Sequence, residues 1–169
     1  RPHFNRRSNN CPRASDIIYR YDEISVGNSY KAIGNNMNKN FLCKKAINAL
    51  ENSCAPYSNC KVGAALLCKN GNIYTGCNIV NASFSPTLCA ERTAFAKAIS
   101  EGDTDFVGIA VAGKKGDTLT AFTPCGVCRQ VMAEFCDSDF KILVVTSNDT
   151  FNEYTLSEIL PNSFSLKEN

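Results

Sequence analysis

The chain has 169 residues, of which 44% are hydrophobic and 20% are charged, and its formal net charge is +2. This length suits one domain with a sizeable core, and no apolar run approaches the roughly 20 residues that a membrane-spanning helix needs. Residues 1–35 hold six basic and three acidic residues, so the rest of the chain is close to neutral and lacks the basic patch typical of nucleic-acid binders.

The composition changes near residue 38. Residues 1–38 are polar with scattered aromatic residues, and we expect them to form a poorly ordered N-terminal extension. From there on, apolar residues recur at helical spacing, which predicts a catalytic domain over 39–169 that opens with a helix over about 39–53. Pro56 cannot continue a hydrogen-bonded helix, so the helix must end before it.

A β-hairpin is predicted next. Two apolar runs, 61–69 and 72–80, are joined by Asn70 and Gly71. An Asn-Gly pair between such runs favours a tight turn, because both turn positions need a positive φ.

Helical and strand periods alternate along the rest of the chain. The pattern predicts a helix over 89–100, a strand over 106–113, a loop over 113–124, a helix over 125–136, a strand over 140–146 and a short last helix that Pro161 stops. A hairpin followed by this alternation predicts an α/β domain with a mixed sheet covered by helices.

The chain contains ten cysteines. Disulfide frameworks belong mostly to small, loop-rich secreted chains, whereas this chain has long helical and strand-like periodicities. We therefore expect mostly reduced thiols, several of them acting as small hydrophobic groups in the core, and a cytoplasmic protein.

Two short motifs carry candidate chemistry. Cys89, Ala90 and Glu91 form a Cys-x-Glu group, and Pro124 precedes a Cys-x-x-Cys pair formed by Cys125 and Cys128. The pair alone could be a redox site or half of a structural zinc site. Together with Cys-x-Glu, it matches the signature of zinc deaminases, in which a cysteine can replace the first histidine ligand.

Three thiolate ligands would leave one zinc position open for water, which is the form of a catalytic site. Each motif lies at a predicted helix start, where the helix dipole favours a thiolate. Three thiolates give a zinc site a net charge of −1, so Arg92 and Arg129 are candidates to offset it from the second coordination sphere. Glu91 is the candidate general acid and base.

With these motifs, residues 40–164 resemble the homotetrameric cytidine deaminase family of pyrimidine salvage. The resemblance covers the segments `PYSNCKVGAALL`, `GCNIVNASF`, `CAERTAFAKAISEGD`, `TPCGVCRQVMAEFC` and `LPNSF`. It implies a five-stranded mixed sheet sandwiched by helices, a bound Zn²⁺ and a tetramer with shared active sites. It also implies hydrolysis of cytidine or deoxycytidine, a small pyrimidine nucleoside, to the uridine nucleoside and ammonia.

The resemblance further implies residue roles. Glu91 would shuttle protons during the attack of water on the pyrimidine. Asn78 would bind the ribose, and Phe164 would approach the pyrimidine of a neighbouring subunit. The substrate-contacting positions it suggests are Asn78, Val80, Cys60, Ala90 and Phe164.

Two of these positions depart from the usual pattern of the family. Val80 stands where relatives usually have a glutamate, and Cys60 stands where they usually have a phenylalanine. These departures leave two alternatives open: a deaminase of a different aminopyrimidine compound, or a zinc-binding homologue with impaired catalysis. A deaminase of polynucleotides is disfavoured by the near-neutral domain, so no nucleic-acid partner is expected.

Overall fold

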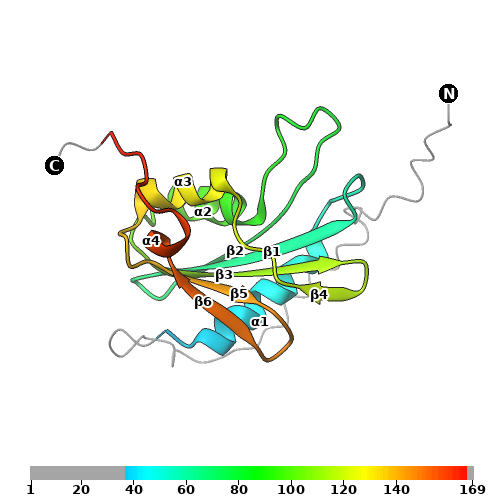
Figure 1. The fold of residues 1–169 in the computed structure, drawn as a ribbon, viewed down its shortest axis with the longest axis horizontal. Coiled ribbons are helices and arrows are strands. Elements are labelled where there is room, and N and C mark those ends of the chain that lie inside the picture. The colour runs from blue at the N-terminus through cyan, green and yellow to red at the C-terminus, as the bar shows by residue number, and fades with distance from the viewer. Residues whose placement is uncertain (1–36, 167–169) are drawn as a thin grey trace.

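The computed structural model describes residues 37–166, which form one sheet with helices on both faces (Figure 1). Almost all of the predicted extension 1–38 lies outside the described residues. The helices are α1 (Lys39–Ala49), α2 (Ala90–Ser100), α3 (Gly126–Phe135) and α4 (Leu156–Ile159), with a 3-10 turn η1 (Leu50–Asn52) after α1. The strands are β1 (Cys60–Cys68), β2 (Ile73–Cys77), β3 (Phe106–Lys115), β4 (Thr118–Thr120), β5 (Lys141–Val145) and β6 (Phe151–Thr155).

The first helix begins where the composition predicts it. The side chain of Asn38 accepts a hydrogen bond of 3.1 Å from the backbone N–H of Phe41 and so caps α1. Together, α1 and η1 cover nearly all of the predicted helix 39–53.

The hairpin is confirmed, with a shorter second strand. β1 pairs with β2 in antiparallel register with Gly63 opposite Cys77. Of the two predicted turn positions, Gly71 has a positive φ (91°) and Asn70 does not, so the turn differs from the expected type. β2 ends at Cys77, three residues before the predicted end at residue 80. Beyond it the chain leaves the ladder, and Ile79 forms an isolated bridge with Leu88 instead.

The sheet is mixed and has the order β2-β1-β3-β5-β6, with the short β4 paired to β3. Only β3 and β5 run parallel, and the other pairs are antiparallel. The sheet therefore has six strands, the expected five along the main path and the additional short strand β4. The prediction of a loop over 113–124 is wrong for its first half. β3 continues to Lys115, the chain turns at Gly116 (φ 58°), and β4 pairs with β3. The apolar pattern also missed β6, an edge strand.

The core has two parts, one on each face of the sheet. Neighbouring residues of β1 point to opposite faces, so Leu66 packs under the helices α2 and α3, whereas Ala65 packs against α1. The two helix layers are visible above and below the sheet in Figure 1. The longest helices between residues 37 and 166 have 11 residues, and none meets the length and apolarity that a membrane span requires.

Candidate metal centre and active site

The first predicted ligand lies at the start of α2. The backbone groups of Ile79 and Leu88 exchange hydrogen bonds of 2.9 and 3.0 Å, which hold the chain extended just before Cys89. Cys89 is the N-cap residue of α2, with φ −76° and ψ 154°. Its carbonyl accepts hydrogen bonds from the N–H and the hydroxyl of Thr93, so α2 begins directly after Cys89. The Cys89 thiol therefore lies at the N-terminal end of the helix.

The other two predicted ligands lie at the start of α3. Cys125 is the N-cap residue, with φ −68° and ψ 165°, and its carbonyl accepts from the N–H of Arg129. Cys128 lies in the first turn of the helix and is 1% exposed. The N-termini of α2 and α3 thus present cysteines from two segments that are far apart in the sequence.

The structure brings the three thiols together. The Sγ atoms of Cys89 and Cys125 are 3.7 Å apart, those of Cys125 and Cys128 are 3.5 Å apart, and all three lie within 4.8 Å of one another. Tetrahedral zinc with Zn–S bonds of about 2.3 Å places its sulfur ligands about 3.8 Å apart. The set therefore fits a zinc ion. Cys125 is exposed and Cys128 is buried, so the cluster is open to solvent on one side only.

The electrostatics of the cluster favour a thiolate. The Cys128 thiol donates a hydrogen bond to Cys89, and this bond, supported by the guanidinium of Arg92 and by Cys125, holds the pKa of Cys89 well below its usual value. The same shared hydrogen bond, together with burial, raises the pKa of Cys128. The lowered pKa of Cys89 favours its thiolate form, which is the form that binds a metal cation.

Glu91 lies beside these thiols in the first turn of α2. Its side chain is 4% exposed, and burial raises the pKa of its carboxyl, with a further increase from the charge on Cys89. A raised pKa makes a carboxyl group a better proton acceptor than an ordinary glutamate, while it can still release the proton afterwards. This is the property that a general acid and base requires.

The two candidate arginines contact different groups. Arg92 donates through Nη2 to the carbonyl of Thr87 at 2.8 Å and to the Sγ of Cys89 at 3.9 Å, so its charge lies directly beside the cluster. Arg129 donates to the carbonyls of Pro124 and Ile159 at 2.7 and 2.6 Å. These bonds join main-chain segments, and no contact of Arg129 with a sulfur is found among the described residues.

The predicted substrate positions lie in three parts of the structure. Asn78 and Cys60 adjoin each other, because the Nδ2 of Asn78 donates to the Cys60 carbonyl at 2.9 Å, and Val80 is half-buried nearby in the chain. Ala90 is the first residue of α2 and is fully buried. Phe164 lies apart, in the C-terminal segment, and its ring is 68% exposed.

Sequence reasoning missed two polar residues. Ser53 is fully buried and donates to the side chain of Asn78. Gln130 follows Arg129 on α3 and donates to the carbonyl of Phe164. Neither belongs to a motif, and each partner is at least 25 residues away, so no local pattern could have indicated the contact.

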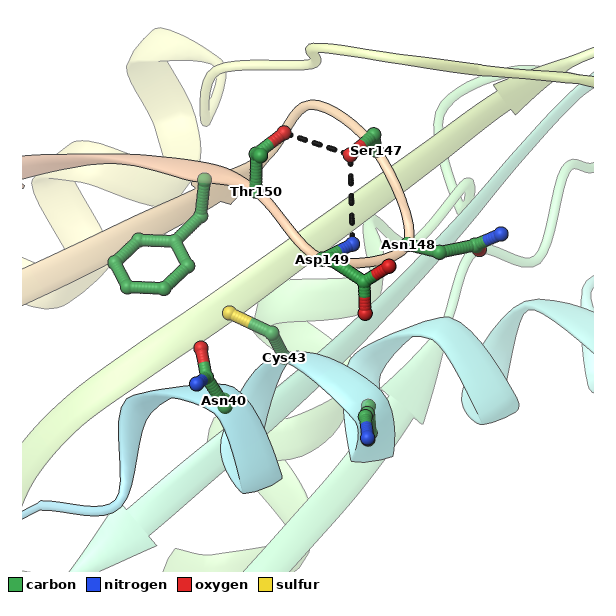
Figure 2. A pocket seen from close by; sticks show the side chains of 8 residues that line it. Asn40, Cys43, Ser147, Asn148, Asp149 and Thr150 are labelled. Atoms are coloured by element: carbon green, nitrogen blue, oxygen red, sulfur yellow. Dashed lines mark hydrogen bonds between the residues drawn. The ribbon is translucent and has the colours of Figure 1, made fainter.

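A pocket also opens on the α1 face of the sheet, between the start of α1 and the loop joining β5 to β6. Figure 2 shows Cys43 and Asn40 facing Ser147, whose hydroxyl bonds to Thr150 at 2.7 Å. The volume of this pocket, about 80 Å³, is far below the range for ligand sites. Burial raises the pKa of the Cys43 thiol to about 11, so this thiol stays protonated. None of the clustered cysteines lines this pocket.

Comparison with known proteins agrees with this geometry. A family model described as "Cytidine and deoxycytidylate deaminase zinc-binding region" matches residues 37–144, which include all three clustered cysteines and Glu91. The chain belongs to the cytidine deaminase family. The curated cytidine deaminase of Halalkalibacterium halodurans is 48% identical over 132 residues, which are 78% of this chain and 98% of the relative. That of Sporosarcina psychrophila is 45% identical over 120 residues, 71% of this chain and 86% of the relative.

Solved cytidine deaminases have the same fold. The crystal structure of the enzyme from Burkholderia pseudomallei is 37% identical, covers 76% of this chain and 100% of its own, and superposes with a TM-score of 0.69. The enzyme from Mycobacterium tuberculosis is 33% identical, covers 78% and 100%, and gives a TM-score of 0.67. All of these relatives are named cytidine deaminases. The comparisons therefore favour neither a different aminopyrimidine nor a loss of activity.

Proposed function

We propose that the protein is a zinc-dependent hydrolase that deaminates cytidine and deoxycytidine to the uridine nucleosides and ammonia. The observation that carries this proposal is the meeting of Cys89, Cys125 and Cys128 beside the buried Glu91. Three thiolate ligands with an open side are the form of a catalytic zinc site, and thiolates favour zinc among the common divalent metals.

Cys89, Cys125 and Cys128 would hold the metal. When bound there, zinc supplies a Lewis acid that makes water nucleophilic at neutral pH. Glu91 would accept one proton from the water that attacks C4 of the pyrimidine and deliver it to N3. It would then take the second proton from the hydroxyl formed on C4 and deliver it to the departing amine. The C4–N bond breaks as ammonia leaves, and the C4 carbon keeps the oxygen of the water. The guanidinium of Arg92 offsets the excess negative charge of the thiolates.

A homotetramer with shared active sites is part of the proposal. Several apolar side chains that adjoin the cysteine cluster in the chain are exposed. They include Leu88 (38%) directly before Cys89, Ile79 (44%) on the strand bridge to Leu88, and Val127 (59%) between Cys125 and Cys128. Exposed apolar groups around a site indicate that another surface covers them. In this assembly Phe164 would contact the pyrimidine of a neighbouring subunit.

We further infer a role in pyrimidine salvage in the cytoplasm, with catalysis assigned to residues 39–169. Eight of the nine cysteines between residues 37 and 166 are free thiols, and Cys54 is disulfide-bonded. Mostly free thiols and a thiolate zinc site are compatible with a reducing compartment. Every candidate site residue falls within residues 39–169.

Ammonia release tests the proposal. The zinc-loaded protein is incubated with cytidine or deoxycytidine, beside the isosteric variant Glu91→Gln and the control Glu101→Gln at the far end of α2. We expect release from both substrates, a loss of at least about 100-fold in Glu91→Gln, and no change in the control. Absence of ammonia from zinc-loaded wild-type protein would refute the function, and full activity of Glu91→Gln would refute the role of Glu91.

A further inference from the structure

The C-terminal segment is tied to the helix that carries two of the candidate metal ligands. Directly after Cys128, the side chain of Arg129 donates to the carbonyl of Ile159 at 2.6 Å. The next residue, Gln130, donates through Nε2 to the carbonyl of Phe164 at 2.9 Å. Both acceptors are main-chain atoms, so these two bonds position the backbone and do not engage the side chain of Phe164.

Arg129 connects the same segment to the metal ligands. Its Nε donates to the carbonyl of Pro124 at 2.7 Å, the group immediately before Cys125. A planar guanidinium holds its donors in a fixed fork, so one side chain sets the position of the end of α4 relative to the loop that enters α3. Ile159 and Leu160 also pack against the buried core under α3. The two regions therefore form one unit.

The side chain of Phe164 is presented outward from this unit. Its ring is 68% exposed although its carbonyl is hydrogen-bonded, and Leu166, two residues later, is 84% exposed. Anchoring the backbone costs conformational entropy, and an exposed aromatic ring does not offset this cost by burial of apolar surface. Such an arrangement is expected where the ring has a contact to make.

We propose that Gln130 is a positioning residue that holds Phe164 at a fixed place relative to α3 for contact with the pyrimidine substrate, with Arg129 anchoring the start of the same segment. This inference rests on the proposed deaminase function for its kinetic consequence. The positioning itself is independent of activity.

Kinetics provide the first test. Gln130→Glu keeps the shape but removes the amide donor, and Gln130→Ala removes it without adding a charge. Both are expected to raise KM for cytidine by about 2- to 10-fold, with kcat within about twofold and one zinc per chain retained. In a Phe164→Ala background, the same substitutions are expected to change KM no further. The control Ser163→Ala, beside Phe164, should behave as wild type.

Fluorescence provides a second test that does not need activity. The chain has no tryptophan, so Phe164→Trp introduces a single reporter. Adding Gln130→Glu or Gln130→Ala is expected to lower the fluorescence anisotropy of this reporter, whereas adding Ser163→Ala is not. Unchanged anisotropy would overturn the positioning role. A KM increase that persists in the Phe164→Ala background would overturn its connection to the substrate. Lower anisotropy in the reporter variants, combined with no ammonia release by the wild-type protein, would refute only the deaminase function.

Discussion

The hydroxyl of Ser53 donates a hydrogen bond of 2.5 Å to the Oδ1 atom of Asn78, and both side chains are buried. The same oxygen accepts from the N–H of Val62 at 2.8 Å, while Nδ2 donates to the carbonyl of Cys60. Three bonds thus determine which way the amide faces, with its oxygen toward the protein. Asn78 can then offer only its remaining N–H to a ligand.

Loss of this bond should weaken both stability and substrate binding. Ser53→Ala is expected to lower the free energy of unfolding by about 1 kcal/mol, because Oδ1 loses one of two partners in a buried place. It is also expected to raise KM for cytidine with little change in kcat. Ser100→Ala, which removes an exposed hydroxyl bond on α2, is the control and should change stability by less than about 0.5 kcal/mol. Urea denaturation and steady-state kinetics measure both effects, and equal losses in the two variants would contradict the prediction.

Substitutions at two glycines distinguish an effect on the stability of the fold from an effect on the metal centre. A Cβ at Gly76 would collide with backbone atoms of Ala90 and Ala94 in α2, whereas a Cβ at Gly63 would collide with those of Ala46 and Leu50 on the α1 face. We expect Gly76→Ala and Gly63→Ala each to cost about 1 to 3 kcal/mol of stability through overpacking.

Only Gly76→Ala should also weaken zinc binding, because it displaces the helix start that carries Cys89 and Glu91. Competition with a chelating dye measures the zinc affinity. Equal affinities in the two glycine variants would show that the position of α2 does not control the site.

Metal removal should affect structure as well as activity. A chelator is expected to abolish ammonia release and lower Tm, because zinc joins α2 to α3. Cys125→Ser should lower zinc affinity by at least about 10-fold. Cys77→Ser keeps a donor for the carbonyl of Asn52 and should bind one zinc per chain. Metal analysis after dialysis checks this, and full zinc retention by Cys125→Ser would remove Cys125 from the ligand set.

Asp103 gives the fold a defined response to acid. Its carboxylate accepts from Asn72 (2.9 Å), Tyr74 (2.8 Å) and Asn70 (2.6 Å), and these bonds, that from Asn72 first, hold the pKa of Asp103 below its usual value. A lowered pKa means that the unfolded chain binds the proton more readily. The contribution to stability is therefore complete at neutral pH and is lost as the pH falls through the folded pKa.

Asp103→Asn should accordingly destabilise the protein at pH 7, and its difference from wild type should shrink below about pH 4. Asp105→Asn is the control, since its pairing with Lys69 at 3.7 Å is exposed and contributes little. Denaturant unfolding at several pH values gives both curves. A difference that stays constant with pH would show that the carboxylate is not the source of the effect.

Val80 offers a gain-of-function test. If the residue lies beside the ribose, as the resemblance implies, then Val80→Glu restores a charged hydrogen bond and should raise kcat/KM for cytidine by about 10- to 150-fold. Val80→Gln, of similar shape but uncharged, should give a smaller gain. A decrease with glutamate but not with glutamine would place Val80 away from the sugar.

Local signals predicted much of the fold and the metal cluster. Cys125 and Cys128 are three residues apart at a predicted helix start, so their spacing alone predicts that their side chains meet. Cys89 and Glu91 are two residues apart, so the pattern predicted that both lie at a helix start but not that their side chains face each other. The Asn70-Gly71 turn and the apolar runs of β1, β3 and β5 were equally clear, because buried strands need continuous apolar sequence. β4 and β6 were missed because they are short or half-exposed, and only pairing with a neighbouring strand makes them strands.

The sequence by itself determined the chemical groups of the site: three thiols, a carboxyl and the helix starts that favour their ionisation. The tertiary structure alone decided how distant segments meet. It placed Cys89 beside Cys125 and buried Glu91, which raises the pKa of its carboxyl. It also oriented the Asn78 amide by the hydrogen bond from Ser53, and it joined Gln130 to the carbonyl of Phe164. These relations depend on packing between residues 25 or more positions apart, or on burial under other elements. No local pattern encodes them, because the distances and solvation that set them arise only when the chain has folded.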